Sequence, residues 1–162
     1  MSRGAIGVRT YEPATDEAWA VELLEGVLGG RLQARRRVIV DALGGPGLVA
    51  TEHSERIGLL TYARVGRECE VVALAARRRQ HGVGTALLEV LKSRLTECDR
   101  IWLVTTNDNL DGLRFYQRRG FRLCALRPGA VDDARDTLKP SISRTGAYGI
   151  PLRDELELEL RM

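Results

Sequence analysis

The segment from residue 68 to residue 106 constrains the fold more than any other part of this chain. It begins with the β-rich run ECEVVALAA, changes from residue 83 onward to apolar residues spaced three and four apart, and ends with the apolar run RIWLVTT. Apolar residues at the helical spacing form one stripe on a helix. A strand, a helix and a second strand in this order predict two parallel strands joined by a right-handed crossover.

The runs before this unit predict one helix and several strands. We expect, in order, a strand at 5–9, a helix at 14–28, and strands at 47–55, 56–65 and 68–76 that form an antiparallel meander. Thr15 or Asp16 can cap the helix. The run RLQARRRVIVDAL (31–43) fits a helix or an extended segment equally well, and the glycines after it indicate a turn.

The runs after the unit complete the sheet. We expect, in order, a helix at 110–119, a strand at 121–127, a short helix at 132–138 and a strand at 156–160. Asn107, Asp108 or Asn109 can cap the first of these helices. The last strand, LELEL, alternates strictly, which predicts a half-buried strand with its glutamates facing outward. The fold class is therefore α+β, as a single domain over 1–162: a mixed, mostly antiparallel sheet with a central parallel βαβ crossover and flanking helices.

Composition excludes several classes of protein. The 25 basic and 22 acidic residues leave a net charge of +3, which together with 5% aromatic residues argues against nucleic-acid binding. The three cysteines (Cys69, Cys98 and Cys124) show no C-x-x-C spacing, so we expect reduced thiols in a cytoplasmic protein. No apolar run is long enough to cross a membrane, no signal-peptide core is present, and no cluster has the spacing of metal ligands.

The run RRRQHGVGT (77–85) places arginines directly before the start of the helix of the crossover unit. The N-terminus of a helix is its positive end and has unpaired N–H groups, so this position favours a bound anion. Gly82 and Gly84 allow an anion to approach the backbone, and arginine binds phosphate oxygens with paired hydrogen bonds. The run lacks both the lysine of a P-loop and the third glycine of a Rossmann fingerprint. It therefore predicts a different kind of phosphate or pyrophosphate site.

Two motifs in this region resemble those of one family. Arg79-x-x-Gly82-x-Gly84 is similar to the R/Q-x-x-G-x-G/A signature of the GCN5-related N-acetyltransferases (GNAT family). NLDGLRFYQRRGF (109–121) resembles the second signature of that family, in the right order and one strand further on. Its matching residues are Asn109, Phe115, Tyr116, Gly120 and Phe121, whereas Gly112 stands where alanine is common.

The resemblance implies a site for acetyl-CoA. The pyrophosphate would lie on the loop formed by Arg79, Gln80, His81, Gly82, Val83, Gly84 and Thr85, where His81 contributes only its N–H. The pantetheine amides would pair with the backbone of Ala73, Leu74 and Ala75 like an added strand. Asn109 matches the asparagine on the cofactor side of the family, and a plain helix cap explains it as well.

The resemblance also implies catalytic residues. Tyr116 matches the tyrosine that protonates the departing thiolate, although a core aromatic at this position would look the same in the sequence. Glu68 and Glu70 are both candidates for the general base, since they share one face of the strand that leads into the site. Each can equally be a surface carboxylate that balances nearby arginines.

The acceptor implied by the resemblance is a primary amine of a small molecule or peptide, attacked directly in a ternary complex. It would enter between residues 15–43 and 128–150, where Asp132, Asp133 and Asp136 could attract a cation or simply belong to a surface helix. The alternative is a non-catalytic acyl-CoA-binding module, which would keep the Arg79–Gly84 site and need neither Tyr116 nor the glutamates. The identity of the amine and the oligomeric state, a homodimer included, stay open.

Overall fold

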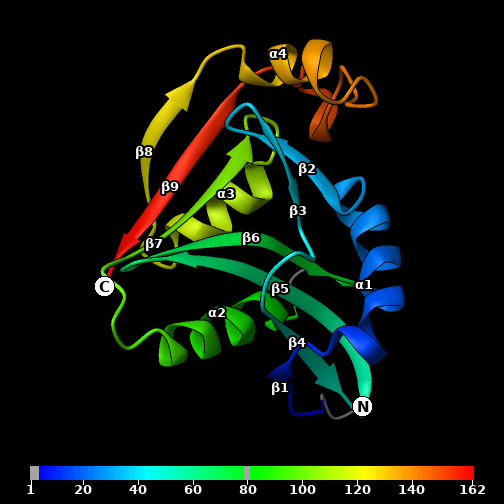
Figure 1. Cartoon of the computed structure of the whole chain (residues 1–162), viewed down its shortest axis with the longest axis vertical. Coiled ribbons are helices and arrows are strands. Elements are labelled where there is room, and N and C mark those ends of the chain that lie inside the picture. Colours follow the sequence, from blue (N-terminus) through cyan, green and yellow to red (C-terminus); the bar gives the residue numbers. More distant parts are fainter. Residues whose placement is uncertain (1–3, 79–80) are drawn as a thin grey trace.

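One seven-stranded sheet forms the centre of the structure, a computed structural model that describes residues 4–78 and 81–162 (Figure 1). Its strands lie in the order β1 (Gly7–Thr10), β4 (Gly47–Glu52), β5 (Glu55–Val65), β6 (Glu68–Ala76), β7 (Arg100–Thr106), β9 (Glu155–Arg161) and β8 (Arg122–Arg127). The β6–β7 pair is parallel and the other pairs of this sheet are antiparallel. The predicted meander and parallel crossover are therefore confirmed.

Helices cover both faces of the sheet. Along β4, Val49 packs with α1 (Pro13–Leu28), whereas Leu48 and Ala50 pack with α2 (Val83–Arg94), because successive side chains of a strand point to opposite faces. Side chains of α3 (Leu110–Gln117) join the α2 side. The sheet thus separates two apolar layers. A further helix, α4 (Ala130–Thr137), and a 3₁₀ turn at Ala147–Gly149 lie in the segment before β9.

The ambiguous run 31–43 forms a second, two-stranded sheet. Its strands β2 (Leu32–Arg35) and β3 (Val38–Asp41) pair antiparallel around a turn in which Arg36 and Arg37 adopt φ values of 48° and 65°. Left-handed backbone at both central residues is the geometry of a tight hairpin turn. The helical alternative for this run is therefore wrong. The sequence contains no glycine or asparagine in the turn, so the usual signal of a hairpin is missing.

The first helix is capped differently from the prediction. Its N-cap is Glu12 and it begins with Pro13, whose missing N–H is not needed in a first turn. Asp16 lies one turn inside the helix, where its Oδ2 accepts the backbone N–H of Glu12 at 2.8 Å. Thr15 and Asp16 are therefore not the cap. The predicted end of the helix is confirmed, since Gly29 adopts the left-handed conformation with φ of 76°.

The two central strands separate partway along their length. β6 and β7 pair only through Glu68–Arg100, Cys69–Ile101 and Glu70–Trp102, although β6 continues to Ala76 and β7 to Thr106. Beyond this point the strands diverge, as Figure 1 shows. A register shift between β5 and β6 leaves Val72 without a partner on β5. Val72 lies two residues after Glu70, the last residue of β6 that pairs with β7. The result is a V-shaped opening in the middle of the sheet.

Candidate cofactor and acceptor site

Beyond Glu70, one edge of β6 pairs with no strand in the part of the chain that the structure describes. The N–H of Arg77 donates to the carbonyl of Ile57 at 3.0 Å, so Arg77 faces β5. Backbone groups alternate sides along a strand, which makes Ala73 and Ala75 face β5 as well and leaves Leu74 and Ala76 facing the opening. Of the three residues predicted to pair with pantetheine, only Leu74 therefore presents its backbone there. The sequence missed Ala76, because the strand pattern does not reveal which edge is paired.

The N-terminus of α2 lies just after β6 in the chain. Gly82 is the N-cap with φ of 80°, and the first turn has neither a side-chain cap nor an acidic residue. Arg77, Arg78 and His81 are exposed. The predicted contacts of Arg79 and Gln80 lie outside the described residues. The N–H groups of Val83, Gly84 and Thr85 belong to the helix end that lacks intrahelical partners, so this end suits an anion.

Gly84 has a packing role that the sequence did not suggest. A Cβ at Gly84 would lie 2.8 Å from Cζ of Phe115, so α2 and α3 approach too closely there for a side chain. A Cβ at Gly82, by contrast, would meet just one atom of the described residues within 4 Å, Cδ1 of Ile6 at 3.9 Å, and the positive φ of Gly82 is what requires glycine. The two glycines of the motif therefore serve different purposes.

Arg119 is a further cation at this helix end. Its Nε donates to Oγ1 of Thr85 at 3.0 Å and its Nη1 to the carbonyl of Phe115 at 2.8 Å. The guanidinium lies over the Phe115 ring at 3.7 Å, and burial together with neighbouring Arg118 lowers the pKa of Arg119. A cation beside the positive end of a helix is unfavourable unless an anion binds there. Sequence reasoning missed Arg119, although it stands inside the second motif.

Asn109 and Tyr116 belong to α3. The Asn109 side chain accepts the N–H of Gly112 at 3.0 Å, which makes it the helix cap, and donates to Oγ1 of Thr105 in β7 at 2.8 Å. A Cβ at Gly112 would lie 2.3 Å from Nδ2 of this side chain as it is placed here, so alanine at this position would require Asn109 to shift. The Tyr116 ring is buried between Phe115 and Phe121, and burial raises its pKa. Its hydroxyl makes no hydrogen bond to a residue that the structure describes.

The two candidate bases have different surroundings. Glu68 begins β6, has a side chain that is 53% exposed, and pairs with Arg100 at 3.5 Å. Glu70 is the last β6 residue that pairs with β7, and its side chain is only 16% exposed. Burial raises the pKa of Glu70, against the opposing effect of Arg35, whose Nε lies 3.0 Å from Oε1 of Glu70. Glu70 thus lies at the apex of the opening, and Glu68 does not.

The hairpin tip bridges the diverging strands. The Nη1 of Arg35 donates to the carbonyl of Val72 in β6 at 3.0 Å. The backbone N–H of Arg36 donates to Oε2 of Glu155 in β9 at 3.1 Å, and its guanidinium lies 5.0 Å from the Trp102 ring centroid in β7. Consecutive residues therefore reach both sides of the opening from the α1 face, and the hairpin forms its wall on that face.

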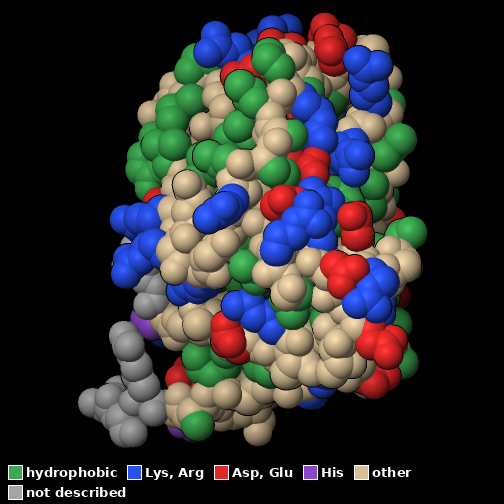
Figure 2. All heavy atoms as spheres, turned by 90° about the vertical axis from the view of Figure 1, so that its left-hand side faces the viewer, with side chains coloured by type: hydrophobic (Ala, Val, Ile, Leu, Met, Phe, Trp, Pro, Cys, Tyr) green, Lys and Arg blue, Asp and Glu red, His purple; other side chains and the backbone are tan. Residues whose placement is uncertain are grey.

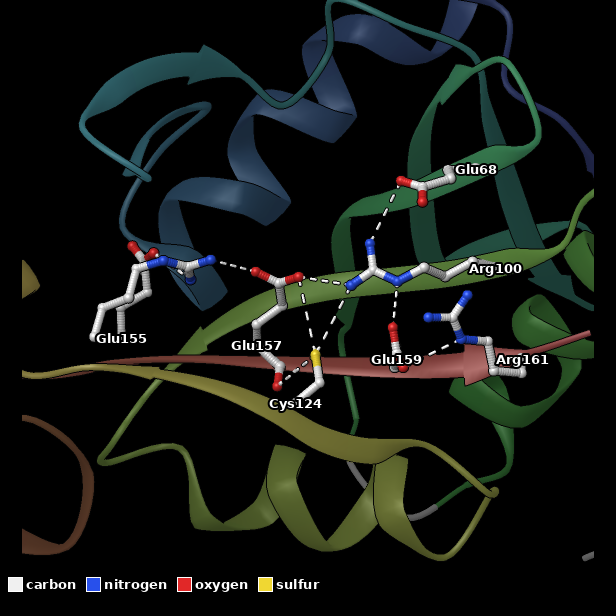
Figure 3. A network of polar contacts seen from close by, with 8 residues as sticks. Glu68, Arg100, Cys124, Glu155, Glu157, Glu159 and Arg161 are labelled. Atoms are coloured by element: carbon white, nitrogen blue, oxygen red, sulfur yellow. Dashed lines mark hydrogen bonds and ion pairs between the residues drawn. The ribbon is translucent and has the colours of Figure 1, made fainter.

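The glutamates of β9 do not face outward as predicted. β9 lies between β7 and β8. Of the two glutamates in the predicted strand, Glu157 is buried and the side chain of Glu159 is only 19% exposed. Glu155, which precedes that strand, is buried as well. These carboxylates tolerate burial because arginines bind them. Arg100 from β7 binds Glu157 and Glu159, as Figure 3 shows. Arg127 from β8 binds Glu155 and Glu157. The alternating pattern was correct for a strand, but the polar face is covered by arginines from its neighbours.

The remaining sequence candidates lie outside this arrangement. Asp132 pairs with Arg135 at 2.7 Å, and Nζ of Lys139 donates to the carbonyl of Leu32 at 2.8 Å, so the two segments predicted to flank the acceptor are in contact. Cys69 is buried, which raises its pKa to about 12 and makes it a poor nucleophile.

Charge and hydropathy of the described residues add two observations. Figure 2 shows basic and acidic side chains interspersed over one side of the molecule, without a large patch of either sign. Among residues 4–78 and 81–162, no helix is long and apolar enough to cross a bilayer, and no group of three or more His, Cys, Asp or Glu residues is placed to hold a metal ion.

Solved structures with the same fold are acetyltransferases. An IAA acetyltransferase from Bacillus cereus superposes with a TM-score of 0.77 at 16% identity, covering 98% of this chain and all of the other. A Bacillus subtilis acetyltransferase in complex with CoA gives 0.73 at 21% identity, covering 98% and 99%. Because the sequence identities are only 16% and 21%, these superpositions establish the fold alone.

The sequence itself establishes the family. The sequence model of the Acetyltransferase (GNAT) family matches residues 15–121. The uncharacterized protein YdhI of Bacillus subtilis is 42% identical over 118 residues, which cover 72% of each chain. The chain belongs to the GNAT acetyltransferase family, so the predicted family and fold are both confirmed.

Proposed function

We propose that this protein transfers an acetyl group from acetyl-CoA to a primary amine of a small molecule or peptide, within a ternary complex. The observation that carries the proposal is the opening between β6 and β7, whose free β6 edge leads directly to the N-terminus of α2. An extended chain that ends in a pyrophosphate fits these two features in that order.

The residues present fit this cofactor. Leu74 and Ala76 offer backbone N–H and C=O groups to the pantetheine amides, as an additional strand would require. The N–H groups of Val83, Gly84 and Thr85 would bind the pyrophosphate, and its charge would offset that of Arg119. The arginines that stand at the unfavourable end of α2 thereby gain a counter-charge.

Two side chains are placed to handle protons. Acetyl-CoA supplies the acetyl group as a thioester, and its transfer forms a C–N bond to the amine while the C–S bond breaks. Glu70 would accept the proton that the amine loses, since it faces the hairpin at the apex of the opening. Tyr116 would donate a proton to the departing sulfur, because its raised pKa keeps the hydroxyl protonated. The two residues approach the sheet from opposite faces.

Substitution of Gly82 tests the cofactor site. Gly82→Glu should lower the affinity for acetyl-CoA about a hundredfold or more, because the new carboxylate repels the pyrophosphate at the position where it binds. Calorimetric titration with acetyl-CoA, followed by CoA release against a panel of amines, measures both binding and turnover.

Gly129→Glu is the matched control. Gly129 is also a helix N-cap with positive φ (73°), so the same substitution strains the backbone equally but lies at α4. We expect this variant to bind acetyl-CoA like the wild type. Equal affinities for all three proteins would contradict the proposed site, and binding without CoA release from any amine would favour a non-catalytic acyl-CoA-binding module.

A further inference from the structure

A buried cation and a largely buried anion meet at the apex of the opening, and each has a polar atom left over. The side chain of Arg35 is 8% exposed, and its Nη2 has no hydrogen-bond partner among the described residues. The same holds for Oε1 of Glu70, whose contact with Nε of Arg35 is short enough for an ion pair but is not aligned as a hydrogen bond. Buried polar atoms of a native protein are rarely left unpaired.

These unused atoms lie next to the expected site of acetyl transfer. Nη1 of Arg35 is held by the carbonyl of Val72, which follows the last paired residue of β6 by two positions. The guanidinium is thereby fixed between Glu70 and Val72. A ligand that reaches the apex from the hairpin face would meet a donor and an acceptor that make no hydrogen bond with the described residues.

The charges at the apex favour a ligand that carries both signs. A simple cation would be attracted by Glu70 but repelled by Arg35 and Arg36. A simple anion would be attracted by Arg35 but repelled by Glu70, and Glu155 and Glu157 also face this pair. A zwitterion satisfies both groups, with its ammonium on Glu70 and its carboxylate on Arg35.

An apolar groove of about 370 Å³ is lined by neighbours of these two residues, although by neither of the two themselves. Ala63, which lies directly opposite Glu70 on β5, forms part of it, and so does Val72. Other apolar walls come from Ile39, Val40 and Ala42. The carboxylate in the groove, Asp41, is bound on both oxygens by Arg31. An apolar side chain attached to the zwitterion would therefore find a matching surface.

We infer that the acceptor is a free amino acid with an apolar side chain. Its α-carboxylate binds Nη2 of Arg35, its amine lies at Glu70, and its side chain lies in the groove beside Val72. This inference rests on the proposed acetyl transfer and specifies the substrate class. Arg35 is then a specificity-determining residue, and its carboxylate contact distinguishes amino acids from other amines.

Matched acceptors test the inference on the wild-type protein. Leucine, methionine and phenylalanine are each compared with their amides and with the corresponding decarboxylated amines in a CoA-release assay. We expect kcat/KM to be about tenfold or more higher for at least one acid than for its amide, which is the effect of one charge-assisted hydrogen bond. We expect the same acid to exceed aspartate. The amide has the less basic amine, so proton loss alone would favour the amide.

Substitutions of Arg35 test whether this residue causes the preference for an amino acid over its amide. Arg35→Met should abolish the kcat/KM ratio between acid and amide, whatever its effect on the absolute rates through Glu70, and Arg35→Lys should retain part of that ratio. Arg36→Met is the control, since Arg36 lies in the same hairpin but contacts Trp102 and Glu155. Acetyl-CoA affinity and the unfolding midpoint of each variant show whether the protein is folded.

The outcomes separate the two proposals. Amides or simple amines that react as well as every acid would overturn the inference while the acetyltransferase proposal stands. An acid preference that survives in Arg35→Met with normal acetyl-CoA binding would also overturn it. If Arg35→Met does not fold, the wild-type ratios and Arg35→Lys decide. Release of CoA by none of the amines would remove the acetyl-transfer proposal itself.

Discussion

Glu68 and Glu70 project from the same face of β6, yet only Glu70 is largely buried beside the opening. The sequence could not choose between them, because a period of two gives both residues the same orientation. What differs is the neighbouring strand: pairing with β7 continues past Glu68 and ends at Glu70. The hairpin then adds Arg35 over Glu70, and this contact comes from a segment whose structure the sequence left undecided.

At this scale we predict that Glu70→Gln lowers CoA release about a hundredfold at neutral pH, since the amide cannot accept a proton. The ionised form is the active one and burial raises the pKa of Glu70. The acidic limb of the wild-type profile of kcat/KM should therefore lie above the ordinary glutamate value of about 4.3, and it should vanish in the variant. Activity is lost as the pH falls through this limb.

Glu68→Gln is the matched control, two residues earlier on the same strand face but exposed. We expect it to keep both the wild-type rate and the wild-type limb. The assignment of the base to Glu70 fails if Glu68→Gln is the slower of the two proteins, or if the limb persists in Glu70→Gln.

Among the elements, the contact between α2 and α3 depends on one glycine. Phe115 occupies the space beside Gly84, and the guanidinium of Arg119 lies over the same ring and binds Thr85. These contacts link the two motifs, which stand far apart in the sequence. The second signature therefore supports the helix end that the first signature forms.

We predict that Gly84→Ala destabilises the protein by about 1–2 kcal/mol, because its Cβ forces Phe115 to move. Acetyl-CoA affinity should fall with it, since Arg119 shifts as well. Gly26→Ala, in the exposed interior of α1 with nothing within 4 Å, should instead stabilise by about 0.5–1 kcal/mol. Urea unfolding of both variants measures the difference, and equal signs for the two substitutions would refute the packing role of Gly84.

Helices and strands were predictable where a long stretch of sequence keeps one regular spacing of apolar residues. The β6–α2–β7 unit shows such a run, and the structure agrees with its order, its direction and nearly its bounds. The hairpin at 32–41 was not predictable, because arginines fill a turn that usually signals itself through glycine or asparagine. The prediction of the site was incomplete for the same reason. Its cofactor half lies on the predictable unit, whereas Arg35 comes from the unpredicted hairpin.

For the molecule as a whole, buried carboxylates bound by arginines couple stability to pH. Asp16 is fully buried, with Arg9 on both of its oxygens at 2.7 and 2.8 Å and Arg56 at 3.2 Å. The hydrogen bonds from Arg9, more than any other contact, lower the pKa of Asp16 to about 2. Burial alone would raise the pKa of Glu157, but hydrogen bonds from Arg127 and Arg100 together lower it. The hydrogen bond from Arg100 also lowers the pKa of Glu159, against a smaller effect of burial.

Because the pKa of Asp16 in the folded protein lies below its unfolded value of about 3.9, ionised Asp16 stabilises the folded state at pH values above 3.9. This stabilisation is lost as the pH falls toward 2. We predict that Asp16→Asn lowers the free energy of unfolding at pH 7 by about 2 kcal/mol and flattens its decline between pH 5 and pH 2. Urea titrations at several pH values provide the measurement. Asp99→Asn removes an equally short two-point contact with Arg67, but on the surface, and should change stability less. The reverse order would contradict the assignment.

The position of β9 also affects how the chain assembles during synthesis. β8 pairs with β9 and not with β7, so β8 has no partner in the sheet when it leaves the ribosome. Residues 155–161 are made after every other strand, and only their insertion brings Arg100 and Arg127 to the carboxylates of β9. A nascent chain that ends before this strand therefore holds one edge of β7 and the whole of β8 unpaired, as exposed edges that other chains can join.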